Sequence, residues 1–164
     1  MQDEKEWFSG CVREYERIMY AVSKDILHND EDVKDALQDA ILHAYENLGQ
    51  LGSKKKFKSW IVKITINASY DILRKRKPES DIEEWKEISA KEINHSERMD
   101  IRIAVEQLKE PYKQVITMFY FYDFKIKEIS DITGDSVGAV KKQLQRAREQ
   151  LKERLMEESV DENR

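Results

Sequence analysis

Apolar residues recur along the first half of the chain with the three- and four-residue spacing of amphipathic helices. Three such stripes cover residues 7–26, 33–48 and 57–73. Asn29 or Asp30, in the break between the first two stripes, is suited to cap the second helix. Because three helices with matched apolar stripes can bury a common core, the pattern predicts a first domain over residues 1–77.

Residues 78–97 show no sustained period and are mostly acidic and polar, which predicts a flexible linker. The alternative for this segment is a short docked helix that packs through Ile82, Trp85 and Ile88. Beyond it, the helical spacing returns in four stretches, at residues 101–108, 111–120, 126–132 and 137–155. Pro111 is suited to open the second of these helices. The pattern therefore predicts a second domain over residues 98–158, followed by a short tail over residues 159–164.

The composition agrees with helices throughout. Among 164 residues there are only five glycines and two prolines, which leaves little material for hairpins, while 40% of the residues are hydrophobic. The predicted fold class is all-α, with two small helical domains joined by a flexible linker. Each domain is small enough to bury only a modest part of its surface, so we expect each to be marginally stable alone.

Charge is distributed unevenly along the chain, whose net charge is −4. Residues 54–77 carry nine basic groups and one acidic group, and residues 136–152 carry five and one. Residues 1–53, in contrast, carry five basic and twelve acidic groups. Two basic segments inside an acidic chain are typical of a protein with two phosphate-facing surfaces, although solvated helix faces remain the alternative on charge alone.

Residues 127–140 have the layout of a helix-turn-helix. Gly134 permits the sharp turn, and Ser136 can cap the second helix. The outward face of that helix presents small residues first and basic residues further along, as in a helix that enters a DNA groove. These residues are Ser136, Gly138, Lys141, Lys142, Gln145 and Arg148, with Arg146 on the flank. A helical hairpin with a basic, solvated face is the alternative.

These residues carry a resemblance to a known family, the extracytoplasmic-function sigma factors of the sigma-70 family. The stretch from Tyr112 to Arg148, which includes Ser136-Val137-Gly138-Ala139-Val140-Lys141-Lys142, is similar to region 4 of that family. Independently, the first domain resembles region 2. Its acidic motif is Asp35-Ala36-Leu37-Gln38-Asp39, and its promoter-melting helix is represented by Phe57-Lys58-Ser59-Trp60, Asn67 and Asp71-Ile72-Leu73-Arg74.

The resemblance implies a sigma factor that binds core RNA polymerase and directs promoter-specific initiation by recognising −10 and −35 elements. The acidic helix would dock on a coiled coil of the polymerase β′ subunit through Asp35, Gln38 and Asp39. The −10 element would be engaged by Lys58, Trp60, Lys63, Asn67, Arg74 and Arg76, although the phase of Trp60 with Ile64 favours a core role for that ring. The −35 element would be read by Ser136, Gly138, Lys141, Lys142, Gln145, Arg146 and Arg148.

Three positions depart from the family pattern. Asp39 replaces the usual Glu, which shortens the side chain and keeps the charge. Asp135 stands where the turn usually has an apolar residue, so the angle between the two helices is an open question for the structure. Ala139 occupies a position that is often Thr, which would remove a contact to the DNA.

The same residues bear on three other classes of function. His28, His43 and His95 are far apart and form no recognised metal motif, and the chain has no glycine-rich phosphate loop, so we expect no enzyme. An autonomous, dimeric helix-turn-helix regulator would explain the second domain but not the acidic motif or residues 57–77. An interaction module that has lost DNA binding is a third alternative.

The remaining expectations concern partners and location. We expect no cofactor and no small-molecule substrate, and as partners we expect core RNA polymerase (the β′ coiled coil and the β flap), promoter DNA and an anti-sigma factor. The single cysteine, Cys11, lies in an apolar stripe, which favours a buried thiol over a reactive one. No apolar run approaches the roughly 18 residues of a membrane span, so we expect a cytoplasmic protein, held at the membrane only through an anti-sigma factor.

Overall fold

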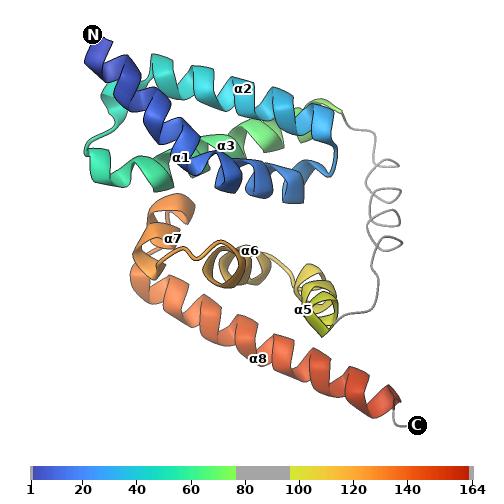
Figure 1. The fold of residues 1–164 in the computed structure, drawn as a ribbon. Helices are drawn as coiled ribbons and strands as arrows, with labels where there is room; N and C mark the ends of the chain where they lie inside the picture. Colours follow the sequence, from blue (N-terminus) through green and yellow to red (C-terminus); the bar gives the residue numbers. More distant parts are fainter. Residues whose placement is uncertain (1, 77–96, 163–164) are drawn as a thin grey trace. The chain divides into compact units, whose positions relative to one another are not determined.

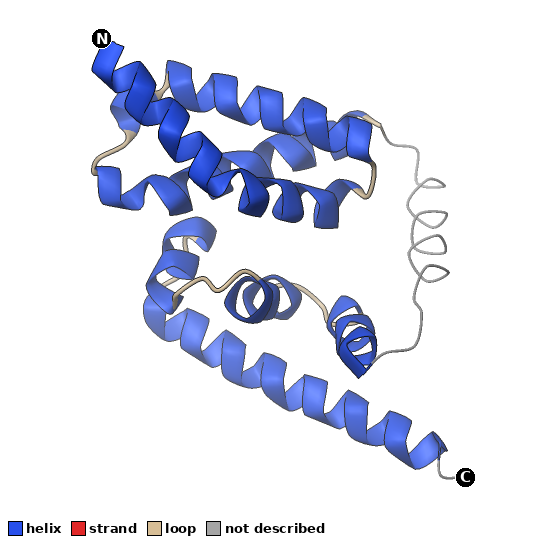
Figure 2. Ribbon diagram, in the orientation of Figure 1, coloured by secondary structure: helices blue, strands red, loops and turns tan. Residues whose placement is uncertain are grey.

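The structure, a computed structural model, describes residues 2–76 and 97–162 (Figure 1). The chain divides into two compact units, Met1–Glu87 and Ile88–Arg164. The described residues contain helices joined by short loops and no strand, which confirms the all-α prediction (Figure 2). None of the described helices is long and apolar enough to cross a membrane.

The first unit is a bundle of three helices, α1 (Gln2–Leu27), α2 (Asp30–Glu46) and α3 (Phe57–Lys75), each of which contacts the other two. Two short 3₁₀ turns, η1 (Leu48–Gln50) and η2 (Lys54–Lys56), lie between α2 and α3. Because the apolar stripes face inward, Met19, Leu27, Val33, Ala36 and Ile61 are fully buried. The three helices predicted from the apolar spacing are confirmed.

Asn29 caps the start of α2. Its side-chain oxygen accepts hydrogen bonds from the backbone N–H groups of Glu31 (2.9 Å) and Asp32 (3.2 Å), as the sequence allowed. Asp30 instead accepts hydrogen bonds from Lys24 (2.7 Å) and from the Tyr20 hydroxyl (2.5 Å), which joins α1 to α2. These two donors hold the pKa of Asp30 below its ordinary value.

The second unit consists of α5 (Glu97–Glu106), α6 (Tyr112–Ile116), η3 (Thr117–Phe121), α7 (Ile126–Thr133) and α8 (Val137–Glu162). Its core includes Val105, Leu108, Ile116 and Ala147, which come from α5, the loop after α5, α6 and α8. The stretch at 111–120, predicted as one helix, is α-helical only to Ile116 and continues as a π-helical turn.

The predicted domain boundaries lie close to the ends of helices. The linker predicted at residues 78–97 falls outside the described residues, except for Glu97, where α5 begins. At the other end, α8 continues to Glu162 and so includes residues 159–162 of the predicted tail.

Candidate nucleic-acid interface

The three residues of the acidic motif share the outward face of α2. Asp35, Gln38 and Asp39 are exposed, because Ala36, Ala40 and Ala44 turn the opposite face of the helix into the bundle. Leu42, one turn further along, is 58% exposed. The sequence interpretation missed Leu42, although its spacing from Asp35 and Asp39 already places it on this face. An exposed leucine beside two carboxylates makes a surface that is both acidic and apolar, which we call the α2 face.

Four of the six residues predicted to contact the −10 element lie together on the outward face of α3. Trp60, Lys63, Asn67 and Arg74 follow one another at intervals that keep a single helical face. Lys63 and Asn67 are exposed, whereas Trp60 is half-buried. Arg74 is exposed and forms an ion pair with Asp71 (3.3 Å), three residues before it. We call these four residues the α3 face.

Lys58 and Arg76 lie elsewhere. They are 18 residues apart, about five helical turns, so they share a direction that is roughly opposite to that of Asn67. Lys58 is half-buried at the first turn of α3. Just beyond the end of the helix, the Arg76 guanidinium forms an ion pair with Asp32 of α2. The structure therefore does not bring these two cations to the α3 face.

An aromatic cluster fixes the start of α3. The Phe57 ring meets Trp7 at a centroid distance of 5.5 Å, Phe8 at 5.9 Å and Trp60 at 5.9 Å. The ammonium of Lys54 lies over the Trp7 ring, 4.7 Å from its centroid. Trp60 thus has the packing role that its four-residue spacing from Ile64 favoured, although the residue as a whole is only half-buried.

Cys11 on α1 is half-buried. Burial raises the pKa of its thiol, and the nearby Glu14 carboxylate raises it further. Lys54 opposes this rise only in part, so the thiol stays protonated and unreactive, but the side chain is half-buried and not fully buried as its place in the apolar stripe predicted.

The turn between α7 and α8 has the predicted helix-turn-helix geometry. Gly134 closes α7 in the left-handed conformation (φ 82°), and the Ser136 hydroxyl accepts a hydrogen bond from the Ala139 N–H (3.1 Å). Hydrogen bonds fix both the backbone and the side chain of Asp135. Its carbonyl accepts a hydrogen bond from Ser130 (2.6 Å), and its carboxylate accepts one from Gln143 of α8 (3.1 Å).

The outward face of α8 collects most of the residues predicted to read the −35 element. Gly138, Lys142, Gln145 and Arg146 are exposed opposite the buried side of the helix, with Lys141 on the flank. A Cβ at Gly138 would meet only the Ser136 hydroxyl, at 4.0 Å, so the start of the helix is open to a close approach. Ser136 itself is exposed, with its hydroxyl engaged in capping. We call these exposed residues the α8 face.

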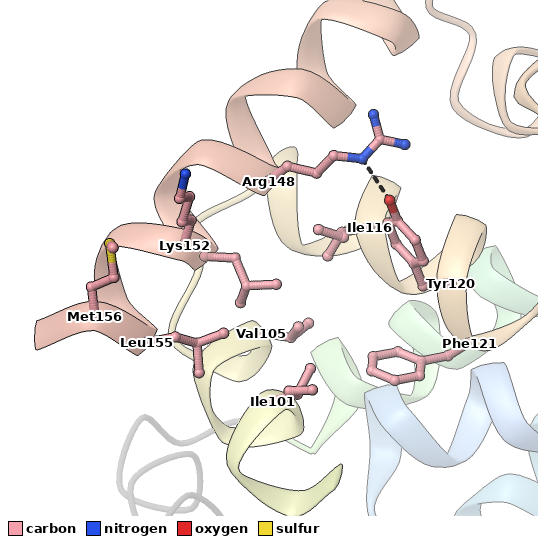
Figure 3. Close-up of a pocket in the computed structure, with 10 residues that line it drawn as sticks. Ile101, Val105, Ile116, Tyr120, Phe121, Arg148, Lys152, Leu155 and Met156 are labelled. Carbon is pink, nitrogen blue, oxygen red and sulfur yellow. Dashed lines mark hydrogen bonds between the residues drawn. The ribbon is translucent and has the colours of Figure 1, made fainter. Parts of the chain in front are cut away.

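Arg148 differs from the other predicted −35 residues. Its Nε donates a hydrogen bond to the Tyr120 hydroxyl (2.5 Å; Figure 3). Its guanidinium also lies 5.6 Å from the Phe119 ring centroid. This places Arg148 at the edge of an apolar groove of about 520 Å³ in the second unit. Ten residues line the groove: Ile101, Val105, Ile116, Tyr120, Phe121, Arg148, Leu151, Lys152, Leu155 and Met156. Sequence spacing did not reveal the groove, since it depends on how α5, η3 and α8 meet.

Within residues 2–76 and 97–162, no three His, Cys, Asp or Glu side chains lie where they could hold one metal ion together.

Comparison with known proteins adds two family matches. Residues 11–79 match the family described as Sigma-70 region 2, and residues 98–151 match the family described as Sigma-70, region 4. The RNA polymerase sigma factor SigV of Bacillus subtilis is 28% identical over 152 residues, which cover 92% of each chain. SigZ of the same organism is 31% identical over 133 residues, which cover 77% of this chain and 75% of SigZ.

Solved structures share the fold. CnrH, in complex with the cytosolic domain of CnrY, superimposes with a TM-score of 0.67 at 20% identity, covering 92% of this chain and 88% of CnrH. The sigma factor RpoE of Bartonella quintana, in complex with the anti-sigma factor NepR, gives a TM-score of 0.64 at 19% identity, covering 95% and 98%. Two sigma regions in family order, with relatives matched over most of their length, show that this chain belongs to the extracytoplasmic-function group of sigma-70 family RNA polymerase sigma factors.

Proposed function

We propose that this sigma factor binds core RNA polymerase through the α2 face and recognises promoter −10 and −35 elements through the α3 and α8 faces. The observation that carries the proposal is the separation of three exposed helix faces by charge, one acidic and two basic, on the two sigma regions that the family assigns to these tasks. An acidic protein needs such a separation, because phosphates are attracted only by local positive charge.

The α2 face suits a basic partner such as the β′ coiled coil. Asp35 and Asp39 would pair with cations, while Gln38 adds hydrogen bonds. Leu42, exposed beside them, supplies an apolar anchor of the kind that contributes much of the affinity at protein interfaces.

The α3 face suits a DNA strand that is being separated. Lys63 and Arg74 would contact phosphates, and the Asn67 amide could bond to a phosphate or a base edge. Trp60, which is only half-buried, would offer a stacking surface to an unpaired base. Lys58 and Arg76 point away from this face, so they would not contact the separated strand directly and would instead help to hold α3 in place.

The α8 face suits the major groove of duplex DNA. Gly138 allows the start of the helix to approach closely, while Lys141, Lys142 and Arg146 offer cations to phosphates and guanine edges. Gln145 lies between them and could bond to an adenine.

The apolar groove of the second unit suits a helical segment of the polymerase β flap. Its floor is apolar, and Arg148 and Lys152 at its edge would pair with acidic side chains on the docked segment. In this proposal Arg148 contributes to polymerase binding rather than to reading DNA.

We propose further that the protein catalyses no reaction, works in the cytoplasm, and is restrained by an anti-sigma factor that covers these surfaces.

Transcription in vitro tests the proposal. Core polymerase with this protein should initiate at specific promoters on a genomic template library, and mapping of the start sites would give both promoter elements. An autonomous regulator would instead bind a palindromic duplex tightly without polymerase. Absence of any promoter-specific transcript would contradict the proposed function.

A charge reversal tests the assignment of the α2 face. Asp39→Lys should weaken binding to core polymerase by roughly tenfold or more, equivalent to about 1.4 kcal/mol, because an attractive contact becomes repulsive. Glu6→Lys, the same reversal at an exposed position of α1, is the matched control and should bind normally. Equal loss of binding in both variants would show that net charge, and not the α2 face, matters.

A further inference from the structure

Asp32 is a carboxylate buried inside the first unit. Its side chain is 0% exposed, although it lies in the first turn of α2, three residues after the capping Asn29. The start of the helix favours a negative charge there, but removing a carboxylate from water costs several kcal/mol unless a partner compensates. Among the described residues, neither oxygen of Asp32 accepts a hydrogen bond of ordinary geometry.

Arg76 is that partner. Its guanidinium forms an ion pair with Asp32, and its own side chain is 50% exposed. The contact joins the start of α2 to the basic segment that follows α3, and the two helix ends meet at one end of the bundle (Figure 1). Arg74 and Lys75, the preceding cations, are exposed and have no such link to α2 among the described residues.

We infer that Asp32 is a positioning residue, which holds Arg76 and with it the basic end of α3 against the polymerase-docking helix. The inference rests on the proposed function, since it assigns α2 to polymerase and α3 to the −10 element. Its consequence is that Arg76 does not act as an ordinary phosphate contact. The buried Asp32 carboxylate already balances its charge, whereas Arg74 is paired only with Asp71, whose side chain is 61% exposed, in a solvated pair that exchanges easily for a phosphate. Phosphates would therefore be met by Lys63 and Arg74 on the α3 face.

A double-mutant cycle on the full chain tests the pair without polymerase or DNA. Asp32→Asn and Arg76→Gln each remove one charge and keep the approximate shape. Arg76→Gln should lower the thermal midpoint of the first unit by at least about 5 °C, because it leaves the buried Asp32 carboxylate uncompensated. Asp32→Asn should lower it by less, because the remaining Arg76 side chain is 50% exposed and water solvates its charge. The double variant should lose less than the sum of the two. Additive losses would overturn the inference.

Tryptophan fluorescence reports this transition selectively, since Trp7, Trp60 and Trp85 all precede residue 88. Arg76→Lys is the conservative variant. It keeps the charge at the pair, so it should restore part of the loss seen with Arg76→Gln.

Initiation kinetics then separate positioning from general stability. Initiation by the holoenzyme is measured well below the thermal midpoints on the promoter found by start-site mapping. Two templates of this promoter are compared, one fully duplex and one with a pre-opened bubble. Asp32→Asn and Arg76→Gln should both slow initiation on duplex by roughly tenfold and leave the bubble template unaffected, because only strand opening needs the aligned end of α3. Normal rates on duplex would overturn the inference.

The dependence of promoter affinity on salt distinguishes a phosphate contact at Arg74 from the positioning role of Arg76. Each phosphate contact contributes about 0.9 to the slope of log affinity against log salt on duplex DNA, and about 0.7 on a separated strand. Arg74→Gln should reduce the slope by about that amount, whereas Asp32→Asn and Arg76→Gln should leave it unchanged. A reduced slope for Arg76→Gln alone would make Arg76 a phosphate contact. If wild-type holoenzyme gave no specific transcript, the proposed function would fail, while the denaturation cycle would still decide whether the pair is coupled.

Discussion

At the scale of single residues, Asp135 shows how a departure from the family pattern is accommodated. The turn usually carries an apolar side chain there, but here the carboxylate accepts a hydrogen bond from Gln143 at 3.1 Å. The backbone N–H of Asp135 also donates to the Thr133 hydroxyl at 3.3 Å. A polar network thus takes the place of an apolar contact. The sequence raised the question but could not answer it, because the partner lies eight residues away on another helix.

Removing this carboxylate should destabilise the second unit. In Asp135→Ala the Gln143 amide loses its partner, and its oxygen is already buried without one among the described residues. We expect a loss of about 1–2 kcal/mol in the free energy of unfolding, measured by urea denaturation followed by circular dichroism. Asp131→Ala, at an exposed position of α7, should change it by less than about 0.5 kcal/mol. Similar stabilities for the two variants would contradict the role of the network.

At the scale of helices, apolar spacing predicted where most elements lie, because burial of one face imposes the 3.6-residue period. It could not predict which outward residues act together. Arg148 fits the outward face of α8 as loosely as Lys141 does, yet a hydrogen bond to Tyr120 directs it to the groove. The π-helical turn of η3 likewise follows from tertiary packing, since the apolar residues of 111–120 fit a regular helix equally well.

This difference along α8 can be measured. Lys142→Ala should reduce the salt dependence of promoter binding by the holoenzyme, by about 0.9 in the log–log slope, because a cation on the α8 face is lost. Arg148→Ala should leave the slope unchanged and instead weaken polymerase binding by the isolated sigma factor, because Arg148 lies at the groove. A reduced slope for Arg148→Ala would return this residue to the DNA-reading set.

At the scale of the whole molecule, two small cores carry the fold. Ile61 belongs to the core of the first unit and Leu144 to that of the second, and both are almost fully buried. The two-domain division followed from the apolar pattern and the acidic segment between its halves. The free energy that couples the unfolding of the two units cannot be predicted from composition or from the helical period.

If the units unfold independently, a cavity in one core should leave the other transition in place. Ile61→Ala and Leu144→Ala should each cost about 2–5 kcal/mol, because a buried side chain is replaced by a void. Ile61→Ala should shift the unfolding of the first unit, which both tryptophan fluorescence and circular dichroism report. Leu144→Ala should shift the unfolding of the second unit, which circular dichroism reports and fluorescence does not. Leu42→Ala, at an exposed position, should shift neither. If one core substitution lowered both transitions together, the two sigma regions would share a single cooperative unit, and surfaces on both would then respond to a ligand bound at either.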